Sequence, residues 1–154
     1  MAQPTVLSFG KGIVFVGDGA SPDEVFTKLC GFNSMSLTIE KDTNDVTVPD
    51  CDKPDDPAWK ATDVLALAWS MEFEGIYAKE SSDLLWAVTT DGQSRSIRLH
   101  LVGGGSGGAT PDLRYSGKGH FGLGLSGERG SKWQNAVNVT GDGALTRASV
   151  AALP

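Results

Sequence analysis

The chain has 154 residues, 40% of them hydrophobic and 21% charged, as expected for a soluble globular protein with one core. No uncharged apolar run reaches the length of a membrane-spanning helix. No basic stretch at the N-terminus leads into an apolar one, so we expect no secretion signal. The formal net charge of −6 disfavours tight binding of nucleic acid, although acidity also serves ordinary solubility.

Two cysteines, Cys30 and Cys51, are present. In a chain without an export signal, thiols are normally kept reduced. We therefore expect both thiols to be free and buried, with a disulfide or a metal site as the alternative.

Short runs that alternate apolar and polar residues predict strands in the first third of the chain. Gly17-Asp18-Gly19 supplies a turn after the first run, and Thr43-Asn44-Asp45 turns the chain after the third. The predicted strands are residues 13–16, 24–31, 35–40 and 46–48.

Residues 49–63 combine three prolines with many aspartates. Proline removes a ladder donor and neighbouring aspartates repel one another, so we expect a long exposed loop. Loops of this length in compact domains often serve a function. Trp59 lies within the loop, where it either contacts a partner surface or folds back onto the core of its own chain.

The clearest strand is predicted for residues 65–78. Apolar side chains alternate with small or acidic ones, so this strand has a dry face and a wet, acidic face. Glu72 and Glu74 belong to the wet face. The dry face consists of Leu65, Leu67, Trp69, Met71 and Phe73.

A helix is predicted for residues 80–91. Leu84, Leu85 and Val88 form an apolar stripe that can pack across the sheet. Ser81 or Ser82 is the candidate N-cap, and Gly92 can end the helix in the left-handed conformation.

The last third of the chain again shows strand patterns. Its longest run is Gly-rich and carries Lys118 and His120 on the polar face. Gly141-Asp142-Gly143 is predicted to turn the chain into a final short strand. The predicted strands are residues 97–101, 114–128, 133–140 and 144–146.

Motifs for catalysis or cofactor binding lack the required context. Gly122–Gly127 matches G-x-G-x-x-G and residues 104–108 match G-x-S-x-G, but no helix follows either run. His100 and His120 are interpreted as polar-face strand residues without a catalytic neighbour. The aspartates of the loop lack the spacing of a calcium site. We therefore expect no catalytic residue, no cofactor and no metal.

The order of these elements resembles the major tail tube proteins of long-tailed phages, relatives of the tubes of gene transfer agents and secretion systems. The resemblance covers about residues 24–146. Its most specific part is the closing segment from Asn138 to Arg147. It also rests on the strand pair around Leu29 and Leu37, the charged loop 43–63, the strand from Ala66 to Gly75, and the predicted helix.

The resemblance implies an antiparallel β-sandwich or half-barrel with one flanking helix, with residues 1–154 forming a single tail-tube domain. It implies hexameric rings that stack into a hollow tube through which DNA passes, in the tail of a virion assembled in the host cytoplasm. The implied partners are further copies of the chain and the tape measure, tail terminator and distal tail proteins, with no membrane. Some members carry an extra C-terminal immunoglobulin-like domain, which we do not expect in these 154 residues.

Within such a tube we expect Glu40, Glu72 and Glu74 to face the lumen, because they lie on polar strand faces and an acidic wall lets DNA slide. We expect the terminal arm, residues 1–12, and the loop 43–63 to make contacts between subunits or rings. The expected contact residues of the loop are Asp45, Asp52, Asp55, Asp56 and Trp59.

Two other classes of function compete with this one. A monomeric carbohydrate-binding β-sandwich would use Trp59, Trp69 or Trp133 as a sugar platform, but Trp69 and Trp133 fall on apolar faces that indicate core positions. A glycosidase would need paired carboxylates such as Glu72 and Glu74, which a solvated acidic surface explains more simply.

Overall fold

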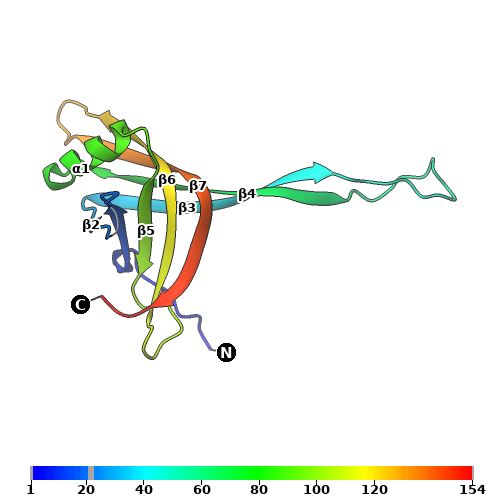
Figure 1. Ribbon diagram of the computed structural model, residues 1–154, viewed down its shortest axis with the longest axis horizontal. Coiled ribbons are helices and arrows are strands. Elements are labelled where there is room, and N and C mark those ends of the chain that lie inside the picture. Colours follow the sequence, from blue (N-terminus) through cyan, green and yellow to red (C-terminus); the bar gives the residue numbers. More distant parts are fainter. Residues whose placement is uncertain (1, 21–22, 154) are drawn as a thin grey trace.

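A computed structural model describes residues 2–20 and 23–153 as one antiparallel sheet with a helix packed against it (Figure 1). The sheet has seven strands in the order β2-β1-β5-β6-β7-β4-β3, which confirms the mainly β fold with one helix. The elements are the 3-10 turn η1 (Phe9–Lys11), β1 (Gly12–Gly17), β2 (Phe26–Lys28), β3 (Phe32–Asp45), β4 (Thr62–Ile76), α1 (Lys79–Thr90), β5 (Arg95–Leu101), β6 (Asp112–Ser126) and β7 (Gln134–Val150).

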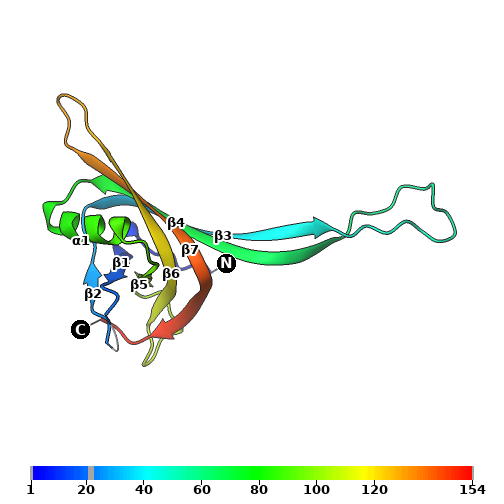
Figure 2. The same ribbon diagram turned by 45° about the horizontal axis from the view of Figure 1, so that its top comes forward.

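The sheet curls so that its two ends enclose the core, and α1 lies across the open side (Figure 2). Because alternate side chains of each strand point inward, every strand except the short β2 contributes to this core. The buried side chains include Val14, Val16, Met71, Phe73, Ile97, Phe121, Val137 and Val139, with Leu85 and Val88 from the helix.

The helix lies one residue before its predicted position, and its apolar stripe is buried as predicted. Its predicted ends are wrong. The N-cap is Ala78, while Ser81 is buried and its hydroxyl accepts the Cys30 N–H at 3.3 Å. The C-cap is Asp91 with φ −76°, so no left-handed glycine ends the helix. Among the described residues, no helix has the length and apolarity that a membrane crossing requires.

Four smaller predictions also fail. The turn predicted at Thr43-Asn44-Asp45 is wrong, because β3 continues through these residues. Residues 46–48 form no strand, and the strand predicted at 24–31 is only Phe26–Lys28. Cys30 and Cys51 are free, as expected, but both are exposed rather than buried.

The last strand, β7, is continuous from Gln134 to Val150, so the predicted turn at Gly141-Asp142-Gly143 is wrong. Ser116 of β6 pairs with Thr146 and Lys118 pairs with Asp142, so residues 143–145 lie opposite a single residue of β6. Gly143 has φ +87°, a conformation that glycine adopts without a steric cost. The glycines therefore form a β-bulge, which bends the strand without ending it.

Trp69 fixes this bulge to the neighbouring strand β4. Its indole lies over Gly117 of β6 and Gly141 of β7, where added Cβ atoms would come within 2.6 Å and 2.5 Å of the ring. The indole N–H donates to the Gly143 carbonyl oxygen at 3.1 Å. Small residues on two strands thus make room for one large side chain, as close packing requires.

We predict that Gly141→Ala lowers the free energy of unfolding of the monomer by about 1–3 kcal/mol, because the new methyl group overlaps the indole and the main chain of Trp69. Urea denaturation monitored by tryptophan fluorescence measures this. Gly92→Ala is the matched control, since nothing lies within 4 Å of its added Cβ, and we expect it to change stability by under about 0.5 kcal/mol. Equal stability of the two variants would contradict the packing described for Trp69.

A buried hydrogen bond between a histidine and a carboxylate holds the other end of the body together. The sequence predicts His100 as a polar-face residue, but the structure buries it against Asp112, with His100 Nε2 and Asp112 Oδ2 2.7 Å apart. The second carboxylate oxygen accepts the Gly103 N–H at 2.9 Å, which anchors the glycine-rich loop. The hydrogen bond from Gly103 and the one with His100 hold the pKa of Asp112 below its ordinary value.

We predict that Asp112→Asn lowers the melting temperature at pH 7 by roughly 5–10 °C. Because the folded-state pKa of Asp112 is depressed, its contribution to stability is complete above the unfolded pKa near ~3.9 and is lost as pH falls through the folded pKa. The difference between wild type and variant should therefore shrink below about pH 4.

Asp142→Asn is the control for this experiment, because Asp142 meets His120 only at 3.9 Å on an exposed surface. Exposed pairs contribute little, so its melting temperature should stay close to that of the wild type. A wild-type melting temperature for Asp112→Asn would show that the buried pair does not anchor the loop.

Candidate functional site

A long two-stranded arm projects from the body (Figure 1). β4 pairs with β7 only from Ser70 to Ile76, whereas it pairs with β3 along nearly its whole length. Beyond Ser70 the arm is therefore a ribbon of β3 and β4 alone. The N–H of Val46 donates to the carbonyl oxygen of Ala61 at 2.9 Å where the ribbon opens into a loop of residues 46–61.

The apolar face of β4 continues from the core onto this arm. Trp69 is buried, but Leu67 and Leu65, predicted on the same dry face, are 69% and 65% exposed. Ile39 of β3 pairs with Trp69 and is also exposed. Ile39, Leu65 and Leu67 are here called the arm stripe. A groove of about 590 Å³ runs beside it, lined by Ile39, Leu67, Trp69, Tyr115, Leu145 and Arg147 among others.

The tip of the arm carries most of the predicted contact residues. Trp59 is 97% exposed, which excludes the alternative that it folds onto the core of its own chain. Asp52, Asp55 and Asp56 are exposed beside it. Asp45 lies at the end of β3, where its carboxylate accepts the N–H and hydroxyl of Thr47; the bond to the hydroxyl is the main cause of its lowered pKa.

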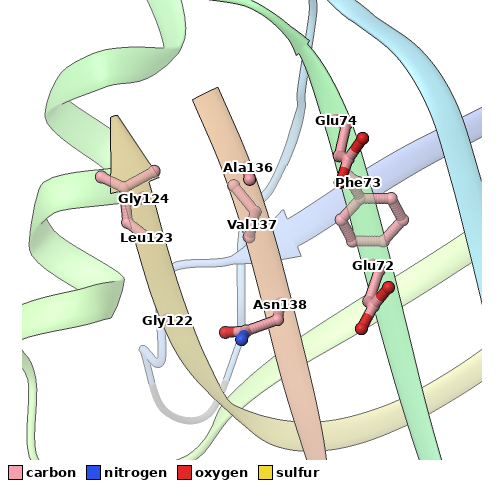
Figure 3. Close-up of a pocket in the computed structure, with 9 residues that line it drawn as sticks. All are labelled: Glu72, Phe73, Glu74, Gly122, Leu123, Gly124, Ala136, Val137 and Asn138. Carbon is pink, nitrogen blue, oxygen red and sulfur yellow. The ribbon is translucent and has the colours of Figure 1, made fainter. Parts of the chain in front are cut away.

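Glu40, Glu72 and Glu74 lie on one exposed face of the sheet. Glu72 and Glu74 alternate on β4, and Glu40 pairs with Ala68 on the same side of that strand. Figure 3 shows Glu72 beside Asn138 of β7, and Glu74 beside Ala136. A shallow hollow of about 440 Å³ opens here, because small residues such as Gly122 and Ala136 line it.

The polar face extends across β7 to β6, where Asp142 lies beside the basic residues Lys118 and His120. His120 of β6 and Asp142 of β7 lie 3.9 Å apart there, and Lys118 pairs with Asp142 in the register. Asp142 belongs to this face because β7 continues through the position of the predicted turn. Carboxylates from three strands thus face solvent together, opposite the core.

The strands β6, β7, β4 and β3 form one layer of the sheet, and a long backbone edge borders it on each side. β3 is the last strand of the sheet, so its outer edge pairs with no strand of the described chain. On the other side, β5 covers β6 only as far as Gly119, and the described partners of His120–Ser126 all belong to β7. Unpaired edges of this length are templates for pairing with another chain.

A family model described as "Phage tail tube protein" matches residues 8–147. The chain belongs to this family. Tail tube proteins are structural components of phage tails, so its place is the tail of a virion-like particle. By sequence, no curated protein matches this tail tube protein.

Solved structures with the same fold include tubes from several assemblies. A chain of the virion of a native gene transfer agent particle has a TM-score of 0.69 at 13% identity, covering 93% of this chain and 99% of that one. The SPP1 tail tube has a TM-score of 0.66 at 6% identity, covering 96% and 81%. A sheath–tube complex of an extracellular contractile injection system has a TM-score of 0.57 at 16% identity, covering 94% and 93%.

The three tryptophans that a sugar platform would use in this tail tube protein do not share a surface. Trp59 lies at the arm tip and Trp69 in the core. Trp133, which the apolar pattern places in the core, is instead 61% exposed just before β7. Sequence reasoning missed this exposure because residues 127–133 form a turn, where alternation no longer reports which side is buried.

Proposed function

We propose that this chain forms hexameric rings that stack into a hollow tube through which DNA passes. The main observation behind the proposal is the arm. It is a two-stranded ribbon, and no part of the described chain covers its apolar stripe. An isolated two-stranded hairpin is marginally stable in water, so the arm requires a neighbour. A gene transfer agent tail of the same fold, reconstructed with C6 symmetry, supports the ring of six.

The rings close through the two free edges of the sheet. The outer edge of β3 in one copy pairs with residues 120–126 of β6 in the next, so that the layers β6-β7-β4-β3 join into one barrel. Joining removes the unpaired backbone groups that an open sheet exposes. Both edges lack a partner strand in the described chain and lie at opposite sides of the same layer, which supports this pairing.

In this arrangement the face with Glu40, Glu72 and Glu74 lines the lumen. Duplex DNA carries about one negative charge per 1.7 Å of its axis. The carboxylates of this face, Asp142 included, outnumber its lysine, Lys118, so the wall repels the phosphates and the DNA slides. The exposure of all three carboxylates on the face opposite the core supports this assignment.

The arm and the N-terminal segment make the contacts between subunits and rings. Leu65, Leu67 and Ile39 each contribute about 1.5–3 kcal/mol when a neighbour covers them fully. The N-terminal segment is also apolar and exposed at Val6 and Phe9, which supports a similar role; Met1 of the predicted arm 1–12 lies outside the described residues. The tape measure, terminator and distal tail proteins are the further partners that a tube of finite length requires.

We predict that replacing residues 45–60 by a short glycine turn leaves a folded monomer that no longer forms tubes. Among the described contacts, the loop bonds only to itself and to the end of its own ribbon, so the body keeps its core. Circular dichroism and urea denaturation report folding, and negative-stain microscopy reports tubes. Tubes of normal length from the deleted protein would contradict the role of the arm.

We predict that the lumen position of Glu72 protects it from large reagents only. In a Cys30→Ser, Cys51→Ser background, Glu72→Cys in tubes should react with a small maleimide but at least about tenfold more slowly with a protein-sized one. Monomers should react with both. Gln93→Cys, just after α1 on the helix side of the sheet, is the matched control and should react with both reagents in both states.

Two results would contradict the lumen assignment for Glu72. Fast reaction of assembled Glu72→Cys with the protein-sized reagent would place the residue on the outer wall. Protection from the small reagent as well would place it inside an interface between copies.

A further inference from the structure

A second bare apolar surface lies away from the arm. Trp86 of α1 and Trp133 before β7 are 68% and 61% exposed, and Tyr77 and Leu125 are partly exposed between them. Tyr77, Trp86 and Leu125 line a hollow of about 180 Å³, and the Tyr77 N–H donates to the Trp133 carbonyl oxygen at 2.8 Å. These four residues are here called the aromatic patch.

The aromatic patch and the arm tip occupy opposite ends of the molecule. Figures 1 and 2 both show α1 and the turn between β6 and β7 at one end and the tip loop at the other. Two different surfaces at opposite ends join copies head to tail, which produces rings or extended assemblies rather than closed pairs.

The charges of the two surfaces are complementary. The tip loop, residues 46–61, contains four aspartates and two lysines. The turn beside the aromatic patch, residues 127–133, carries Arg129 and Lys132 against Glu128. Asp83 lines the hollow itself, so the aspartates of the tip fit over the turn rather than over the hollow.

We propose that the aromatic patch, with Arg129 and Lys132, is the docking site for the arm tip of another copy. Trp59 enters the hollow between Tyr77, Trp86 and Leu125, while Asp55 and Asp56 meet the basic turn. Burial of this indole accounts for a tryptophan that is 97% exposed in the single chain. This proposal rests on the proposed tube, and it identifies the surface that the arm tip contacts within that tube.

A charge exchange tests the docking site. Asp55→Lys with Asp56→Lys, and separately Arg129→Glu with Lys132→Glu, should each reduce the yield of tubes roughly tenfold, since like charges then meet in the contact. All four changes together should restore the yield to within about threefold of wild type. The changed residues are exposed, and circular dichroism of the monomers checks their folding. Undiminished tubes from either pair, or no restoration in the combination, would overturn the docking site.

Cross-linking tests the same contact with Trp59, Trp86 and Trp133 all intact. In the Cys30→Ser, Cys51→Ser background, oxidised tubes of Ala58→Cys with Lys132→Cys should give a ladder of covalent multimers on a non-reducing gel. Ala58→Cys with Gln93→Cys, at the far end of α1, should give none. Tubes without a ladder from the first pair, or equal ladders from both, would place the arm tip elsewhere or assign the patch to another protein. Failure of the unaltered protein to form any tube would instead overturn the proposed function.

Discussion

The apolar face of a strand must be covered, and β4 is longer than the core that its own chain provides. Trp69, Met71 and Phe73 are buried in the body, while Leu67 and Leu65 continue the same face into solvent on the arm. A monomer has no means to correct this, because beyond Ser70 the ribbon has only two strands. Association with further copies covers the exposed stripe and also pairs the open edges of the sheet. Such association is the behaviour expected of a member of the tail tube family.

The body that carries the arm is complete by itself. Trp69 joins β4 to the bulge of β7 at the root of the arm, and the pair of His100 and Asp112 anchors the glycine-rich loop at the other end. These contacts lie within one chain and are largely buried, so the subunit can fold before it assembles. In the proposed tube the layered sheet forms the wall, and the extended arm links its parts.

Much of the fold follows from local patterns, and the errors have a common physical origin. Alternation places β4 and its two faces correctly, and the stripe of Leu85 and Val88 places the helix to within one residue. Alternation does not show where a core ends. Only the length of β4 indicates that the strand must leave the body, because fifteen residues span about 50 Å, whereas a chain of this size has a radius of gyration of about 15 Å.

The pattern at Gly141 and Gly143 predicts a turn, but glycine favours turns and bulges alike. The choice between them depends on Trp69, which lies more than seventy residues away in the sequence. His100 is buried with Asp112 as the partner of its Nε2, a pairing that no local pattern reveals. Strand faces alone predict the acidic residues, whereas the aromatic patch gathers residues from α1, β6 and two connecting segments.

The central claim is that the open sheet of one copy is completed by the next. A cryo-electron-microscopy map of assembled tubes, at a resolution that traces the main chain, tests it most directly. The account predicts main-chain hydrogen bonds between the outer edge of β3 and residues 120–126 of the neighbouring β6, with the arm stripe covered. Tubes in which both edges face solvent, or concentrated protein that remains monomeric under all conditions of assembly, would contradict it.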